Sequence, residues 1–320
     1  MTTAYPALTL PAKARIHSYL STRDLDAATT LDVLALARTI KSELKAGRAL
    51  PLLAGKTLAM IFQKPSLRTR VSFETGMTQL GGHAIYLGPS DIQLGARETV
   101  EDIAIVLSRM SDLIMARVFG HQIVADLARY ATVPVINGLS DLEHPCQILG
   151  DLLTILERKE CLAGLRLVFV GDGNNVANSM LFGSALTGMH CTIACPHGYE
   201  PPAALLADAR SLARASGSRL DVTADVRAAC ENADVLYTDV WTSMGQEAES
   251  RKRLQDFRGY QVDTALLRLA RPDAVLLHCL PAHYGEEIEY AVSRTPNSAI
   301  FDQAENRLHA QKALMVAMAG

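Results

Sequence analysis

The stretch TLAMIFQKPSLRTRVSFETGM, at residues 57–77, contains the structural unit that recurs along this chain. Its apolar start, residues 57–62, is typical of a buried strand, and a segment of helical period follows from residue 64. Similar units occur throughout, as short apolar runs bounded by Gly, Pro or Asp alternate with helical segments. This alternation predicts an α/β protein with doubly wound parallel sheets.

The candidate strands fall into two sets, which predict two parallel sheets. The first set lies at residues 57–62, 83–87, 112–116 and 133–136, and the second at 165–170, 190–194, 219–223, 235–237 and 274–277. Helices are expected between the strands, in the first half near residues 67–80, 99–110 and 121–131. An amphipathic stretch before the first strand carries Leu31, Leu34, Ile40 and Leu44 on its expected apolar face.

Two further helices determine the expected domain organisation. A segment from Glu143 to about residue 159 would join the two sheets, and a final helix over about 303–319 has no strand after it. We therefore expect a first domain at 1–142 and a second at 143–302. The remaining segment, 303–320, is expected to pack back on the first domain.

Composition excludes several functional classes. With 320 residues, 49% of them hydrophobic, the chain is long enough for two buried cores. Lys and Arg (31) nearly balance Asp and Glu (34), so there is no positive field to hold nucleic acid or an anionic membrane. No apolar run approaches the ~18 to 20 residues of a membrane span, and residues 1–20 lack an apolar signal core. We expect a cytoplasmic protein.

The six cysteines show neither a Cys-x-x-Cys pair nor the density of a disulfide scaffold. Cys191 and Cys195 lie in an apolar, strand-like stretch, so we interpret them as core residues and not as metal ligands. We expect all six to be reduced thiols and most of them to fill the core: Cys146, Cys161, Cys191, Cys195, Cys230 and Cys279.

The segment SLRTR (66–70), directly after the first strand, predicts an anion-binding helix start. Ser66 can cap the helix, and the first-turn amides and helix dipole favour negative charge. Arg68 and Arg70 add fork-shaped donors that match phosphate oxygens. The alternative is an ordinary capped helix with solvated arginines.

Two other candidate phosphate motifs fail. The segment GKT (55–57) ends like a nucleotide P-loop, but Leu50 stands where the first glycine is required. The segment GDGNNV (171–176) follows a strand like a dinucleotide fingerprint, yet Val176 stands where the third glycine belongs. A dinucleotide-dependent oxidoreductase is therefore an alternative that the fold permits and the residues disfavour.

Three more motifs follow predicted strands or open a helix, where open α/β sheets bind ligands. In HPCQ (144–147) the first and last side chains project near one helix end and suit a small carbonyl or amide, although a capping histidine with a surface glutamine is the simpler alternative. DVWTSMGQE (239–247) combines a carboxylate, a hydroxyl and a glycine turn, as an amine-recognising loop would. In HCLP (278–281), Cys279 is core packing, a nucleophile or a positioning group; we favour the last, because the segment does not resemble a cysteine-hydrolase turn.

Together with AENR (304–307), these motifs resemble ornithine carbamoyltransferases in order and spacing over almost the whole chain. The resemblance implies transfer of the carbamoyl group from carbamoyl phosphate to the side-chain amine of L-ornithine, giving citrulline and phosphate. It implies a homotrimer with active sites shared between subunits, and no metal or organic cofactor. The expected role is arginine biosynthesis, although the sequence leaves the direction of the reaction open.

The resemblance also assigns the carbamoyl phosphate contacts residue by residue. The phosphate would be bound by Ser66, the Leu67 backbone, Arg68, Thr69 and Arg70, with Gln93 reaching in from a neighbouring subunit. Arg117, His144 and Gln147 would surround the carbamoyl group. The other expected carbamoyl phosphate contacts are Arg307, the backbone of Cys279 and Leu280, and Pro145 and Cys146. Two departures from the family pattern, Leu67 and Tyr284, remove no required side chain.

The implied ornithine contacts lie in the second half of the chain, at Asn174, Asp239, Ser243 and Met244. They would hold the α-amino and α-carboxylate groups while the loop from 239 to 244 closes over the amino acid. The residues expected to act in catalysis are Arg117, His144, Asp239 and Cys279.

The chemistry agrees with these assignments, because cationic donors stabilise a departing phosphate and the oxyanion of a tetrahedral intermediate. The attacking amine must be neutral, and the departing phosphate is its expected proton acceptor. Rival hypotheses are a different acceptor (aspartate, acetylated or succinylated ornithine, or putrescine) and a non-enzymatic small-molecule sensor or binding partner of an active carbamoyltransferase.

Overall fold

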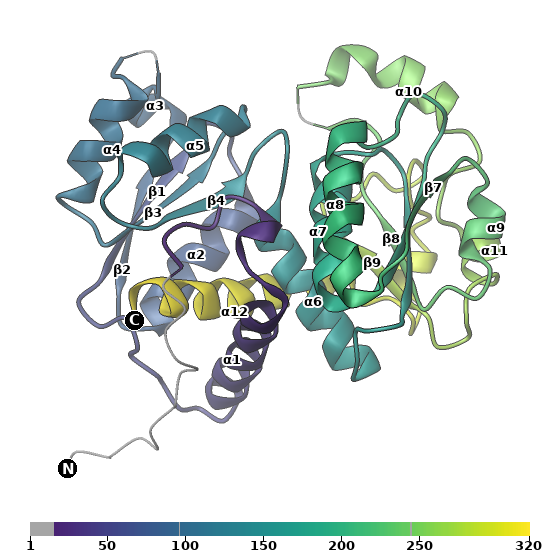
Figure 1. Ribbon diagram of the computed structural model, residues 1–320, viewed down its shortest axis with the longest axis horizontal. Coiled ribbons are helices and arrows are strands. Elements are labelled where there is room, and N and C mark those ends of the chain that lie inside the picture. Colours follow the sequence, from purple (N-terminus) through teal and green to yellow (C-terminus); the bar gives the residue numbers. More distant parts are fainter. Residues whose placement is uncertain (1–15, 96, 244) are drawn as a thin grey trace.

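The computed structural model describes residues 16–95, 97–243 and 245–320. Met244 lies outside these ranges, and so does the ornithine contact expected of it. Residues 1–15 also lie outside them, and they make up most of the stretch that was expected to lack an apolar signal-peptide core. Within the described ranges the chain forms two all-parallel sheets, which occupy separate halves of the molecule (Figure 1).

Each predicted strand is present. The first sheet has the order β2-β1-β3-β4 and consists of β1 (Thr57–Phe62), β2 (His83–Leu87), β3 (Leu113–Arg117) and β4 (Val135–Leu139). The second has the order β7-β6-β5-β8-β9 and consists of β5 (Arg166–Val170), β6 (His190–Ala194), β7 (Leu220–Thr223), β8 (Val235–Thr238) and β9 (Val275–His278).

Helices connect the strands in both halves. The first half contains α1 (Ala27–Lys45), α2 (Leu67–Gln79), α3 (Pro89–Ile92), α4 (Val100–Ser108) and α5 (His121–Tyr130). Next come α6 (Pro145–Lys159), α7 (Asn175–Thr187), α8 (Ala203–Ser216), α9 (Val226–Cys230), α10 (Ser250–Asp256), α11 (Thr264–Leu267) and α12 (Ile300–Ala319). Three 3-10 turns complete the described elements: η1 (Thr22–Asp24), η2 (Glu247–Glu249) and η3 (Val292–Arg294).

Helices cover both faces of the central strands, as a doubly wound fold requires, whereas the edge strand β2 is partly exposed. Along β1, Leu58 and Met60 pack into one apolar cluster with α1, α2 and α12, whereas Ala59 and Ile61 pack into another with α4 and α5. Alternate residues of β5 divide in the same way between α7 and α8 on one face and α9 and α11 on the other. Continuous apolar strands follow from burial on both faces, and the predicted fold class is confirmed.

The buried face of α1 differs from the predicted one at one position. Leu34 and Ile40 are buried, but Leu31 is 50% exposed, so the prediction is wrong for this residue. Leu31 lies about 120° around the helix from Ala37, the centre of the buried stripe.

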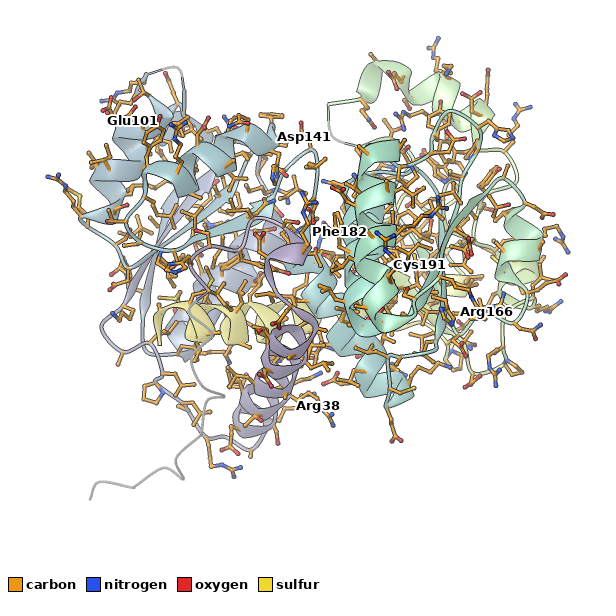
Figure 2. The ribbon with its side chains drawn as sticks, in the orientation of Figure 1. Arg38, Glu101, Asp141, Arg166, Phe182 and Cys191 are labelled. Atoms are coloured by element: carbon orange, nitrogen blue, oxygen red, sulfur yellow. The ribbon has the colours of Figure 1, made fainter. Side chains whose placement is uncertain are left out.

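The cysteines follow the prediction. All six are free thiols, and Cys146, Cys191, Cys195 and Cys230 are buried. Figure 2 shows Cys191 and Phe182 inside the second half, with Arg38 and Glu101 on the outside. None of the helices in the described part of the chain is long and apolar enough to cross a membrane.

Helix α12 ties the two halves together. It packs along α6 and α1, and it also contacts α2 of the first half and β9 of the second. Gly150 on α6 permits the close approach of α6 to α12, because a Cβ at this position would lie 3.1 Å from the backbone nitrogen of Arg307 on α12. The C-terminal segment therefore returns to the first half, as expected, and begins at Ile300 instead of residue 303.

The strand orders determine where a ligand can bind. In each sheet the order reverses at one point, between β1 and β3 in the first and between β5 and β8 in the second. Loops that leave such a point in opposite directions open a crevice beyond the carboxyl ends of the strands. Here the two crevices join in one cleft.

Candidate active site

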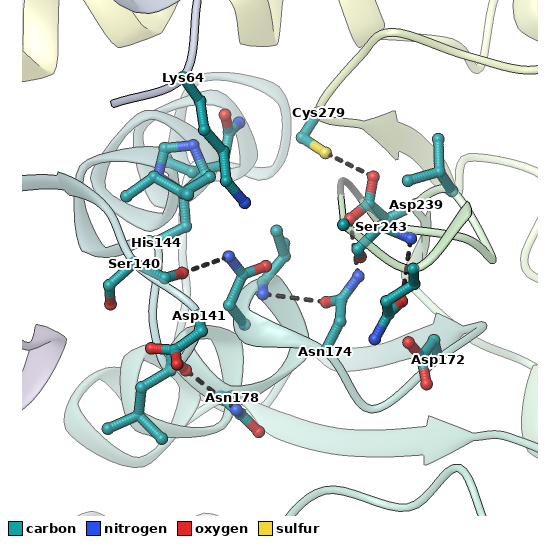
Figure 3. Close-up of a pocket in the computed structure, with 18 of the residues that line it drawn as sticks. Lys64, Ser140, Asp141, His144, Asp172, Asn174, Asn178, Asp239, Ser243 and Cys279 are labelled. Carbon is teal, nitrogen blue, oxygen red and sulfur yellow. Dashed lines mark hydrogen bonds between the residues drawn. The ribbon is translucent and has the colours of Figure 1, made fainter. Parts of the chain in front are cut away.

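The cleft between the two halves has a volume of about 1380 Å³. Figure 3 shows His144 and Lys64 on one side of it, and Asp239 and Cys279 on the other. The cleft brings together most of the predicted site residues, from both halves and from α12: Ser66, Leu67, Arg68, Arg117, His144, Gln147, Asn174, Asp239, Ser243, Cys279, Leu280 and Arg307.

The start of α2 forms the predicted capped helix end. Ser66 is the N-cap, and its Oγ accepts the backbone N–H of Thr69 at 3.3 Å. The Thr69 hydroxyl oxygen in turn accepts bonds from Ser66 Oγ at 3.1 Å and from the Arg307 guanidinium at 3.0 Å. Thr69 thus joins α2 to α12, and the helix N-terminus opens toward the cleft with Arg68 beside it.

Three arginines converge on this end of the cleft. Burial, together with the nearby Arg307 and Arg68, lowers the pKa of Arg117 to about 10. The pKa values of Arg307 and Arg68 are also lowered, in each case chiefly by burial. All three remain protonated at neutral pH, so the site concentrates positive charge that a bound dianion would neutralise.

Five of the predicted contacts do not line the cleft. Thr69 lies directly behind it, and the other four lie elsewhere. Arg70 pairs with Glu74 at 3.0 Å and lies over the Tyr86 ring, with its guanidinium carbon 3.9 Å from the ring centre. Gln93 is exposed at the end of α3. Pro145 and Cys146 are buried in the first turn of α6.

The carbamoyl end of the predicted site contains two buried polar side chains, those of His144 and Gln147. Burial lowers the pKa of His144 well below its usual range, and Arg307, Arg117 and Arg68 lower it further, so the imidazole is neutral. Gln147 is only 1% exposed, which rules out the surface glutamine considered from the sequence. His144 Nδ1 and Gln147 Oε1 are buried and lack a partner in the described structure. Buried polar groups need partners, so these atoms point to a bound ligand.

The opposite wall presents a carboxylate fixed on both sides. Asp239 Oδ1 accepts the Cys279 thiol at 2.9 Å, and Oδ2 accepts the Asn174 amide at 2.8 Å (Figure 3). Asn174 also caps α7, since its Oδ1 accepts the backbone N–H of Val176 at 2.9 Å. Burial and the adjacent Asp239 raise the pKa of Cys279 well above its usual range. A protonated thiol is a poor nucleophile, which favours the positioning role.

The loop after β8 is anchored by two residues that the sequence did not reveal. Arg253, only 6% exposed, donates to Asp172 Oδ2 and to the Trp241 carbonyl, both at 2.9 Å. Within the loop, Ser243 N–H donates to Gln246 Oε1 at 3.1 Å. Asp172 lies in GDGNNV, the motif examined for dinucleotide binding, but nothing in the sequence linked it to Arg253.

A buried histidine shapes the turn after β9. His278 Nδ1 accepts the Leu280 backbone N–H at 2.9 Å, so Nε2 carries the proton donated to Glu287 Oε1, also at 2.9 Å. These bonds hold Leu280 at a φ of 58°, a costly left-handed conformation for a non-glycine residue. Asp239, His278 and Cys279 place ligand atoms within 4.8 Å of one another. Since both ring nitrogens of His278 are engaged, this trio offers a metal ion no free imidazole lone pair.

Comparisons with known proteins agree with this arrangement. Residues 17–157 match the family model "Aspartate/ornithine carbamoyltransferase, carbamoyl-P binding domain", and 163–318 match its "Asp/Orn binding domain". An ornithine carbamoyltransferase of Methanosarcina acetivorans is 52% identical over 93% of this chain and 97% of its own length. An anabolic ornithine carbamoyltransferase of Pyrococcus furiosus is also 52% identical, over 94% of this chain and 96% of its own.

A solved structure of ornithine carbamoyltransferase from Pyrococcus furiosus superposes with a TM-score of 0.93 at 51% identity, covering 95% of this chain and 97% of that one. The chain therefore belongs to the aspartate/ornithine carbamoyltransferase family, and the predicted transferase class is confirmed.

Proposed function

We propose that the protein transfers the carbamoyl group of carbamoyl phosphate to the side-chain amine of L-ornithine, and that the sites expected from the sequence perform this reaction. The observation that carries the proposal is the division of charge across the cleft. Three cationic guanidiniums and a helix N-terminus occupy one wall, and the carboxylate of Asp239 lies on the other. An anionic donor and an amine acceptor would each meet opposite charge.

The geometry accounts for the chemistry. The phosphate would lie at the start of α2, on Ser66, Arg68 and Thr69, where the arginines stabilise the negative charge that develops as the carbon–oxygen bond breaks. The neutral His144 retains one N–H, and with Arg117 it would donate to the carbamoyl oxygen as that atom becomes an oxyanion. The departing phosphate would take the proton that the attacking amine loses.

The second half would hold the amino acid. Asn174, Asp239 and Ser243 lie together on the far wall, where they would bind the α-amino and α-carboxylate groups. The high pKa of the Cys279 thiol keeps it protonated and bonded to Asp239, so it orients that carboxylate. Convergent positioning of two reactants supplies a large part of such a rate enhancement.

The structure around Gly173 disfavours the alternative hypothesis of a dinucleotide-dependent oxidoreductase. A Cβ at this glycine would lie 2.4 Å from the Pro201 backbone nitrogen, so the chain itself fills the space beside the glycine. In a dinucleotide-binding turn that space admits the pyrophosphate.

One assay tests the activity and the acceptor together. Purified protein is supplied with carbamoyl phosphate and, separately, L-ornithine, acetylornithine, succinylornithine, putrescine or aspartate, and each ureido product is quantified. We expect citrulline from ornithine and much slower turnover of the others. Binding of carbamoyl phosphate with no product from any acceptor would support the sensor hypothesis instead, and faster turnover of another acceptor would reassign the substrate.

We further propose a cytoplasmic homotrimer that acts in arginine biosynthesis, in which Gln93 completes the site of the adjacent subunit. The exposed position of Gln93, outside the cleft of its own chain, supports this assignment. In a cyclic trimer each subunit has one donating and one receiving face.

A subunit-mixing experiment tests the shared site. Gln93→Ala and Cys279→Ala proteins, each nearly inactive, are unfolded and refolded together. About three trimers in four are then mixed, and each mixed trimer regains about one site in three, so activity should approach roughly a quarter of the wild-type value. Verified mixed trimers without recovered activity would show that Gln93 is not shared.

A further inference from the structure

A buried carboxyl group lies directly behind the carbamoyl end of the cleft. Asp151 is four residues after Gln147 on α6, it is fully buried, and it does not line the cleft. Its Oδ1 accepts the Gln147 amide nitrogen at 2.8 Å and the Gln303 amide nitrogen at 2.7 Å. Neither bond is part of the site expected from the sequence.

The first of these bonds determines which end of the Gln147 amide faces the ligand. A side-chain amide has one nitrogen that donates and one oxygen that accepts. Because the nitrogen of Gln147 is bound to Asp151, its oxygen is left for the cleft, and that atom is buried without a partner in the described structure. A carbonyl oxygen accepts from an NH2 group, which the carbamoyl group carries and a phosphate does not.

The assignment does not depend on the protonation of Asp151. Burial raises the pKa of this carboxyl to about 7, so both forms are populated near neutral pH. Oδ1 accepts from the two amides in the ionised form, and it still accepts when Oδ2 carries the proton. The Tyr237 hydroxyl also interacts with this carboxyl group.

The bond between Asp151 and Gln303 extends the network to the end of strand β9. Gln303 donates to Asp151 and, at 3.1 Å, to the Tyr237 hydroxyl, while its Oε1 accepts the His278 backbone N–H at 2.8 Å. One carboxyl group therefore connects the carbamoyl-facing side of α6 with the end of β9, directly before Cys279.

We propose that Asp151 is a positioning residue for carbamoyl recognition, which holds the Gln147 amide with its oxygen toward the carbamoyl NH2. The inference rests on the proposed transfer reaction and adds to it the group that orients its amide contact. Without Asp151, the amide can rotate and present its NH2 to the ligand's NH2, which places two donors against each other.

The same helix offers a control carboxylate that is more exposed than Asp151. Glu157, also on α6, accepts bonds from Lys41 at 2.7 Å and from Asn306 at 2.8 Å, and so joins α6 to α1 and α12. It resembles Asp151 as a carboxylate between helices, but neither of its partners lines the cleft.

A double-mutant cycle tests the proposal. Asp151→Leu, Gln147→Ala, the double variant and Glu157→Met are compared for kcat and for the KM of carbamoyl phosphate. Leucine is used because asparagine would keep an oxygen that can accept from Gln147. We expect Asp151→Leu to lower kcat/KM for carbamoyl phosphate at least tenfold, and the double variant to be no worse than Gln147→Ala within about twofold, because Asp151 acts through Gln147. Glu157→Met should lower thermal stability and leave kcat/KM within about twofold.

Other results separate the possible failures. Losses from the two single substitutions that multiply in the double variant, or a kinetic effect of Glu157→Met equal to that of Asp151→Leu, would overturn the positioning role. If Asp151→Leu does not fold, Asp151→Ala takes its place in the cycle with the same expectations. An inactive wild type would instead refute the proposed function, whereas an active wild type with a kinetically silent Asp151→Leu refutes only this inference.

Discussion

The three converging arginines should make the unliganded enzyme less stable than it could be, and Arg117 is where this can be measured. Its pKa falls from 12.5 to about 10, mainly through burial. At about 1.4 kcal/mol per pKa unit, this shift corresponds to roughly 3 kcal/mol of lost stability. Because the folded-state pKa is lowered, the loss is complete below about pH 10 and disappears as the pH rises toward 12.5. At neutral pH it is therefore present in full.

Arg117→Met removes the buried charge and keeps much of the side-chain volume. We expect the unliganded variant to gain up to about 3 kcal/mol in free energy of unfolding, since replacing a buried charge by an apolar group is often stabilising. The wild type should be stabilised strongly by carbamoyl phosphate, and the variant only weakly, because binding favours the folded state in proportion to affinity.

Urea unfolding at 25 °C and pH 7, with and without carbamoyl phosphate, measures both effects. Arg38→Met, at an exposed site on α1, serves as the control and should change neither quantity appreciably. A variant that is less stable than the wild type and still fully stabilised by carbamoyl phosphate would refute the reasoning, because Arg117 would then be a structural residue.

Three further substitutions test other parts of the structure. Asp239→Asn should lower kcat/KM for ornithine by roughly 10- to 150-fold, since a hydrogen bond to a charged group is worth about 1.5–3 kcal/mol, and leave the KM of carbamoyl phosphate nearly unchanged; equal damage to both substrates would indicate a structural role. Gly150→Ala should cost about 1–3 kcal/mol in urea unfolding and raise the KM of carbamoyl phosphate, because its Cβ would lie 3.0 Å from Arg307 Cγ and 3.1 Å from the Arg307 nitrogen; a fully stable, fully active variant would contradict this packing. For Asp151→Asn, the raised pKa of about 7 means that wild-type stability is lost as the pH rises from about 4 to 7, so the variant's relative stability should grow by roughly 3 kcal/mol from pH 5 to pH 8; a pH-independent difference would exclude the shift.

The elements of the fold were predictable because their signals are local. β1 is an almost continuous apolar run and β6 alternates polar with apolar residues, and the sequence predicted both with their observed bounds. The strand orders were not predictable, because they depend on which apolar runs pair over long distances. The misplaced Leu31 has a similar origin, since several stripes around α1 are apolar and only tertiary packing selects one.

The candidate site was predictable where its residues follow strands in recognisable motifs. The Ser66 cap lies within the motif SLRTR, and the bond between Cys279 and Asp239 joins two other motifs that follow strands. The supporting residues were not found, because each acts through a partner far along the chain. Asp172 meets Arg253, and Asp151 meets Gln303, only after folding. No local pattern carries that information.

Helix α12 limits how the two halves can move relative to each other. Gln303 bonds to α6 and to the end of β9, and one turn later Arg307 bonds to Thr69 on α2. Sliding α12 along its axis relative to either half would break these bonds. Because the helix is bonded to both halves, a shear movement between the halves would cost hydrogen bonds on at least one side of the cleft.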